Sequence, residues 1–107
     1  TTNKLKIEVV LGGGSLSSTN AVVTMALFKD SDTDAIAASY LPKEATANRR
    51  AAGGLTHYMT AGSVSEITFK VRIGRASTGT FTFNGSSGAR RFGGVMASSI
   101  TITEIKA

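Results

Sequence analysis

A strict alternation of apolar and polar residues in the second half of the chain limits its possible folds more than any other feature. Every second residue from Ile67 to Ile73 is aliphatic or aromatic, and threonine, lysine and arginine stand between them. The alternation returns from Phe81 to Phe83, and a last strand-like run extends from Ser98 to Ile105. A period of two is typical of strands with one buried face. These short segments, separated by glycine-containing turns, favour antiparallel neighbours.

Three segments of the first half carry a similar signal. Asn3 to Leu11 predicts a first strand and Leu55 to Ala61 a later one, because both have a period of two. Ala21 to Lys29 predicts a strand that is apolar on both faces, so either both faces are covered or one of them meets a partner. The residues expected on one face of the first strand are Leu5, Ile7, Val9 and Leu11.

The segments between these strands are interpreted as turns or loops. Gly12–Ser15 should end the first strand as a turn, because it lacks the spacing of a phosphate-binding loop. Asp30–Asp34 should be a polar turn, because the glycine and the distal glutamate of a calcium loop are missing. Ala35–Leu41 fits a helix or a short strand. The long segment Pro42–Gly54 is a candidate partner-binding loop or an ordinary crossover.

The C-terminal region adds three local predictions. Asn84-Gly85 predicts a tight hairpin turn, because both residues tolerate positive φ. Phe92 is expected to fill the core while the arginines before it project outward. Ile105 is out of phase with Ile100 and Ile102, which indicates a bulge or a terminal residue that turns to meet another surface.

Together these segments predict one all-β domain over residues 1–107. Seven or eight short strands with a turn about every eight to twelve residues are typical of antiparallel sandwiches. The predicted architecture is therefore an antiparallel β-sandwich or a jelly roll with about eight strands.

The low charge of the chain bears on its surface. Charged residues make up 18% of the sequence, whereas about 25% is usual for soluble domains. This predicts that part of the surface is covered by other subunits, or else that the surface is built of serine and threonine. No apolar run approaches the about 20 residues that a membrane span requires, so we expect no membrane insertion.

The residue types that carry chemistry are sparse. The chain has no cysteine and a single histidine, His57, so neither a disulfide framework nor a convincing zinc site can be argued. No carboxylate pair and no nucleophile with an adjacent base stands out. We therefore expect no enzyme activity, no metal and no cofactor, and we interpret His57 as a structural or interface residue.

The net charge of +5 leaves an acidic partner open. The basic residues are scattered, and the aromatic residues follow strand-core spacing, so nucleic-acid binding is not expected. Two arginine doublets lie in segments that contain glycine, and arginine is favoured at interfaces. The predicted partner contacts are accordingly Arg49, Arg50, Arg90 and Arg91.

Five blocks of the sequence carry a resemblance: Leu11–Gly14, Ala26–Asp30, Thr60–Gly62, Thr68–Arg72 and Phe92–Ile105. With them the chain resembles, over nearly its whole length, a group of bacteriophage and prophage virion domains. Such domains occur as C-terminal modules of tail-fibre-like proteins and as small stand-alone structural proteins. The last block, FGGVMASSITITEI, is the most specific of the five.

The resemblance implies a homotrimeric jelly roll of the C1q and tumour-necrosis-factor type, made in the bacterial cytoplasm and displayed on the virion surface. One implied role is a capsid decoration (cement) protein or a head or tail fibre component, bound to the major capsid protein or to a fibre stalk. The alternative is a tail-fibre or spike tip that binds a host cell-surface glycan or protein. A complete protein, with Thr1 following an excised initiator methionine, suits decoration, and a domain of a longer chain suits the tip.

Overall fold

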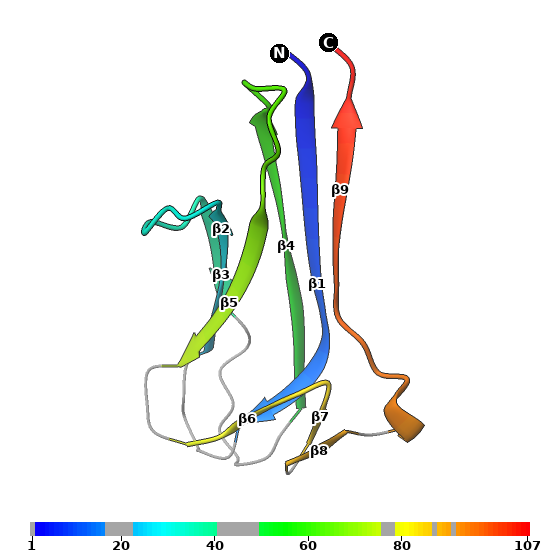
Figure 1. Ribbon diagram of the computed structural model, residues 1–107. Helices are drawn as coiled ribbons and strands as arrows, with labels where there is room; N and C mark the ends of the chain where they lie inside the picture. The colour runs from blue at the N-terminus through cyan, green and yellow to red at the C-terminus, as the bar shows by residue number, and fades with distance from the viewer. Residues whose placement is uncertain (1, 17–22, 41–49, 76–78, 87, 91) are drawn as a thin grey trace.

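The protein folds into two antiparallel β-sheets that face each other (Figure 1). The computed structural model describes residues 2–16, 23–40, 50–75, 79–86, 88–90 and 92–107. The first sheet contains β1 (Lys4–Leu16), β4 (Arg50–Thr60), β6 (Phe81–Phe83) and β9 (Ser99–Ile105). The second contains β2 (Val23–Lys29), β3 (Ala37–Tyr40) and β5 (Phe69–Arg75). These seven strands confirm the predicted all-β fold.

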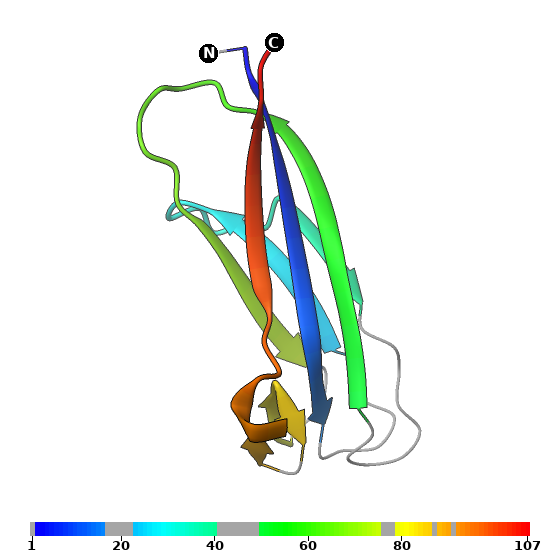
Figure 2. The same ribbon diagram turned by 90° about the vertical axis from the view of Figure 1, so that its right-hand side faces the viewer.

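Two short elements complete the described part of the chain. β7 (Gly85–Ser86) pairs with β8 (Ala89–Arg90), and a single 3₁₀ turn spans Phe92–Gly94. This turn is the only helical element among the described residues. The two chain ends lie side by side at one end of the molecule (Figures 1 and 2), where the backbone N–H of Ala107 donates a hydrogen bond to Asn3 Oδ1.

β1 is the central strand of the first sheet, with β4 on one side and β9 on the other. Its residue Ile7 lies opposite His57 of β4 and Ile102 of β9, so these three side chains share the inner face. The second sheet is centred on β2, which pairs with β3 and β5. The alternation read in the sequence thus sets which side of each sheet faces the other sheet.

The core lies between the two central strands. Alternate residues of β1 and β2 point into the space between the sheets, as the period of two predicted. Ile7 and Leu27 are fully buried there. The buried apolar residues are Leu5, Ile7, Val9, Leu11, Val23, Met25, Leu27 and Ala61.

The outer face of β2, which the sequence predicts to be apolar, is partly covered within the chain itself. Thr24, Ala26 and Phe28 are half-buried on that face. The guanidinium carbon of Arg72 lies 5.0 Å from the centroid of the Phe28 ring, a distance typical of a cation–π contact. A side chain of the neighbouring strand therefore covers part of this apolar surface without a partner.

The prediction that Gly12–Ser15 ends the first strand is wrong. β1 continues to Leu16, with an irregular register between Leu11 and Gly14, and pairs there with β6. A Cβ on Gly14 would lie 2.6 Å from the Phe81 ring and 2.7 Å from the carbonyl oxygen of Thr82. Glycine is present because β6 approaches closely.

Two further predictions concern the middle of the chain. Of the two alternatives for Ala35–Leu41, the strand is confirmed, because β3 pairs with β2 over four residues. The predicted loop Pro42–Gly54 is wrong at its end, because β4 begins at Arg50 and pairs with β1 across Gly53 and Gly54. Residues 41–49 lie outside the described part. The predicted faces of 55–60 are confirmed, with Leu55, His57 and Met59 half-buried and the residues between them exposed.

The predicted Asn84-Gly85 hairpin is wrong, although the positive φ is confirmed at Asn84, with a value of 58°. β6 before this point pairs with β1, whereas β7 after it pairs with β8. The dipeptide therefore bends the chain from one sheet to the small ribbon. Phe92 does not fill the core: it is 72% exposed and begins the 3₁₀ turn with a φ of 54°.

β9 confirms the last predicted strand, and it contains no bulge, because it pairs with β1 in an unbroken register from Ser99 to Ile105. Ile105 lies opposite Lys4 and so occupies the outer face. Its phase relative to Ile100 and Ile102 needs no irregularity.

Candidate functional site

One long side of the molecule is left open between the two sheets. β9 is paired only with β1, and β5 only with β2, among the described strands. No described strand bridges β9 and β5. On the opposite side β3 approaches β4, where Ser39 Oγ donates a hydrogen bond of 3.2 Å to the carbonyl oxygen of Gly54. The sandwich is therefore closed along β3 and β4 and open along β5 and β9.

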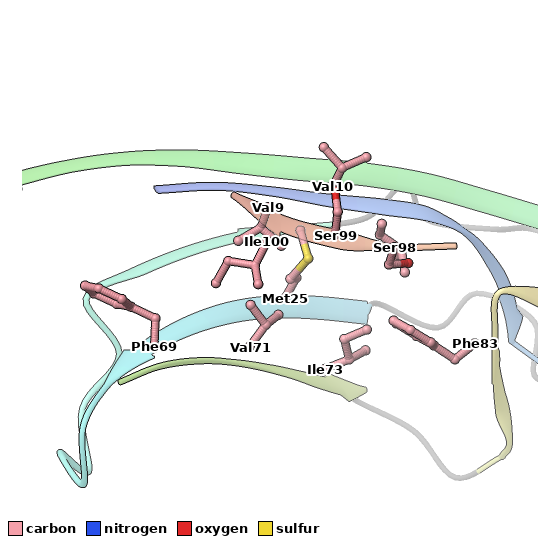
Figure 3. A pocket seen from close by; sticks show the side chains of 11 residues that line it. Val9, Val10, Met25, Phe69, Val71, Ile73, Phe83, Ser98, Ser99 and Ile100 are labelled. Atoms are coloured by element: carbon pink, nitrogen blue, oxygen red, sulfur yellow. The ribbon is translucent and has the colours of Figure 1, made fainter. Parts of the chain in front are cut away.

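The open side forms an apolar hollow of about 220 Å³ (Figure 3). Ile100 and Val9 border it from the first sheet, and Val71 and Ile73 from the second, while Met25 lies between them. Drug-sized ligands usually occupy enclosed pockets of about 300–1,000 Å³ with a few polar groups. The hollow is smaller than these, and its full lining is Val9, Val10, Leu11, Met25, Phe69, Val71, Ile73, Phe83, Ser98, Ser99 and Ile100.

A second hollow continues the first along the same side, and Phe69 lines both. Ile102, Glu104 and the loop of Ser63–Ser65 line this second part. We call the two hollows together the open-side groove. It extends from Phe83 at one end, past Ile100 and Ile102, to Glu104 at the other.

The apolar side chains that line the groove are accessible. Ile100 is 42% exposed, Ile102 48% and Phe83 47%. Ile100 and Ile102 lie on the inner face of β9, opposite Val9 and Ile7 of β1, which are both buried. The isoleucines are therefore core-type residues that the second sheet does not cover.

Hydrogen bonds hold both ends of β9 in place. Before the strand begins, Ser98 Oγ accepts a bond from the backbone N–H of Gly12 (3.1 Å) and donates one to Asn84 Oδ1 (2.7 Å). Near the end of the strand, Asn3 Nδ2 donates to Glu104 Oε1 at 2.7 Å. Sequence reasoning missed these residues, because their partners are 14 to 101 positions away. These hydrogen bonds hold β9, which forms one wall of the groove, at both of its ends.

The structure describes the backbone of two of the four arginines that were predicted to contact a partner. Arg50 is the first residue of β4 and pairs with Ser15, while Arg90 ends β8 and pairs with Gly85. These two strand ends lie at the same end of the molecule, away from the chain termini (Figure 1). Arg49 and Arg91 lie outside the described residues.

Two hydrogen bonds join the start of the aspartate turn to Thr68. Asp30 Oδ1 accepts the backbone N–H of Thr68 at 2.9 Å, and the backbone N–H of Asp30 donates to the carbonyl oxygen of Thr68 at 2.7 Å. The described residues contain no group of three metal-ligating side chains. In the same part of the chain, no helix has the length and apolarity needed to cross a membrane.

On the outer face of the first sheet, Lys6 Nζ and Glu8 Oε1 form an ion pair at 3.3 Å. A hydrogen bond and the charge of Glu8 raise the pKa of Lys6 above its ordinary value, with a smaller contribution from Tyr58. The stabilisation that accompanies this shift is fully present below the unfolded-state pKa of lysine and is lost as the pH rises through the folded-state pKa.

We expect Glu8→Gln to lower the pKa of Lys6 and to leave the fold unchanged, because both side chains lie at the surface. An NMR titration of the Lys6 side chain in both proteins measures the shift. Lys4, whose Nζ donates to Thr60 Oγ1, provides the internal control. An unchanged Lys6 pKa would show that Glu8 does not stabilise the protonated form of Lys6.

No protein-family model, no curated protein and no solved structure matches the chain.

Proposed function

We propose that this chain is a non-enzymatic structural module of a bacteriophage virion, displayed on the particle surface as a homotrimer of jelly-roll subunits. The open-side groove is the observation that carries the self-association. A chain with isoleucines 42% and 48% exposed in core-type positions is more stable when a partner covers them. The virion assignment is supported by the sequence blocks that resemble phage surface domains, most of all Phe92–Ile105.

The favoured role is a capsid decoration protein or a head or tail fibre component. A small all-β subunit whose apolar side is covered by sister copies presents its polar faces to the shell and to solvent. The net charge of +5 favours docking on an acidic capsid surface. The alternative role is a fibre or spike tip that recognises a host glycan or protein, since anionic cell-surface polysaccharide attracts the same positive charge.

The test of the virion assignment is the composition of purified particles. We expect peptides of this chain in phage particles purified from a lysate of the host, and a particle density map should place three copies together on the capsid or at a fibre. Density at a capsid three-fold junction identifies decoration, and density at the end of a fibre identifies the tip. A chain that stays in the soluble lysate and is missing from pure particles would contradict the proposal.

A second experiment tests the arginine contacts. We expect replacement of Arg49-Arg50 or Arg90-Arg91 by alanine to weaken attachment to particles that lack the protein by at least about tenfold per doublet, because arginine contacts are frequent interface hot spots. The double variant with Lys4→Ala and Lys6→Ala is the matched control. It also removes two positive charges, but from the outer face of β1. Equal attachment of the doublet variants and wild type, with an unchanged circular-dichroism spectrum, would exclude these arginines.

A further inference from the structure

We infer that the open-side groove is the docking surface for a second copy of this chain, which adds to the first sheet along the free edge of β9. The inference deepens the proposed function and rests on its self-association, because it names the partner and the surface. It does not depend on where in a virion, or whether in a virion, the assembly is displayed.

The first argument is the unprotected edge of β9. Its seven residues pair with β1 without a break, so the other edge presents a regular row of backbone donors and acceptors. Edge strands of soluble proteins are usually blunted by proline, lysine, a bulge or a covering segment. Residues 99–105 contain no proline and no lysine, and their register contains no bulge. Their one charged residue, Glu104, stands near the end of the strand, where Asn3 Nδ2 donates a hydrogen bond to it. Such an edge is a template for another strand.

The edge of β5 on the other side of the groove is different. Lys70 and Arg72 alternate along it and are exposed, and charged side chains on an edge strand oppose the addition of a further strand. The two walls of the groove therefore have different roles. β9 offers its backbone, while β5 offers Phe69, Val71 and Ile73 as an apolar surface beneath the incoming strand.

The second argument is that the groove fits a strand with the same alternation of apolar and polar residues as β9. Ile100 and Ile102 face the groove, and Thr101 and Thr103 face outward. A strand added beside β9 places every second side chain over the groove and the others on the polar outer face. The partner must therefore alternate apolar and polar residues, and this chain supplies several such strands.

The third argument is charge. Glu104 is the one charged residue among those described as lining the groove, and it lies at one end. The chain as a whole carries +5, so a second copy is a partner of opposite net charge to Glu104. An acidic partner, such as a nucleic acid or an acidic protein, finds no cation in the described lining. The groove favours an uncharged to basic partner.

The fourth argument is surface area. The accessible surface of the chain is 6429 Å², whereas a compact monomer of this mass exposes about 5,600 Å². The surplus of about 800 Å² belongs to the surface as a whole, and an interface of standard size would cover a similar area on each partner. The radius of gyration of 15.6 Å, compared with about 13 Å for a compact domain of this length, agrees with an elongated subunit.

The test is the mass of the purified protein in dilute solution, for wild type and for two lysine variants of β9. Ile102→Lys places a charge in the groove, while Thr103→Lys places the same charge one residue away on the exposed outer face. We expect wild type and Thr103→Lys to have a mass of at least twice 11.0 kDa. We expect Ile102→Lys to be a folded monomer, with a dissociation constant raised at least about a hundredfold, because it buries an unpaired charge in the contact.

Hydrogen exchange of the β9 amides is the second measurement. Alternate amides of this strand face away from β1, so they should exchange slowly in wild type and quickly in Ile102→Lys. A monomeric wild-type protein at micromolar concentration would overturn the inference. So would an Ile102→Lys protein that assembles as wild type does, because the copies would then meet through another face.

The two proposals fail in distinguishable ways. A wild-type assembly that Ile102→Lys dissociates supports the groove contact even when the chain is missing from purified particles, which contradicts only the virion role. Particles that incorporate Ile102→Lys as efficiently as wild type, with copies in contact through a different face in the density map, contradict only the groove contact.

Discussion

Replacing Ile7 with alanine should lower the free energy of unfolding by about 3–4 kcal/mol. Ile7 is fully buried at the centre of β1 and belongs to the cluster that joins the two sheets. The change removes apolar burial and leaves a cavity, because the flanking strands are held by their own backbone bonds and cannot close over it. Urea denaturation at one fixed protein concentration measures the change.

Val10→Ala is the matched control for that experiment. Val10 lies in the same strand and is 52% exposed, and although it borders the hollow, its side chain points to the opposite face of the sheet (Figure 3). Its truncation should change the free energy of unfolding by less than about 0.5 kcal/mol. Because association stabilises the folded state, both substitutions are best compared in the Ile102→Lys background, where unfolding is expected to involve one chain. Equal effects of the two substitutions would mean that the core is not centred between the sheets.

The same two positions show what periodicity could predict. A period of two assigns Ile7 and Val10 to opposite faces, and the structure confirms that one face is buried and the other is not. The faces of β5 and β9 follow equally from their sequence. Local pattern is sufficient here because the direction of a side chain in a strand depends only on its position within the pleat.

The groove could not be predicted in this way. Ile100 and Ile102 have the same alternation as Ile7 and Val9, and nothing local separates the covered pair from the exposed pair. Their exposure arises because no described strand joins β9 to β5 along the open side. The pattern of a single strand identifies the face that favours burial, and the arrangement of the other strands decides whether burial occurs within one chain.

The predictions for Gly12–Ser15 and for Phe92 were also wrong. Gly12–Ser15 looked like a turn because glycine is common in turns, yet the close approach of β6 and of residues 97–98 requires small residues in a strand. Phe92 looked like a core residue because it is large and apolar, but its positive φ places it in an exposed 3₁₀ turn. The glycine positions depend on contacts between segments far apart in the sequence.

Gly12→Ala should therefore lower the free energy of unfolding by about 3 kcal/mol, although Gly12 lies on the surface. A Cβ on Gly12 would overlap the carbonyl oxygen of Ala97 and lie 3.0 Å from its carbonyl carbon. Backbone atoms cannot rotate away as a side chain can, so residues 97–98 must move, at a cost of about 1–3 kcal/mol. The movement also breaks the hydrogen bond from the Gly12 N–H to Ser98 Oγ, worth about 1 kcal/mol.

The matched control is Gly74→Ala in β5, where an added Cβ meets no atom within 4 Å. This substitution should leave stability unchanged or raise it by about 0.5 kcal/mol, because alanine restricts the unfolded chain. Only Gly12→Ala is therefore expected to lower the free energy of unfolding, and urea denaturation separates the two variants. Gly12→Ala should also weaken self-association, because Ser98 and Ser99 line the groove and stand at the start of β9. A Gly12→Ala protein as stable as wild type would show that β9 is not anchored to β1 at this point, and the groove would then have no fixed wall.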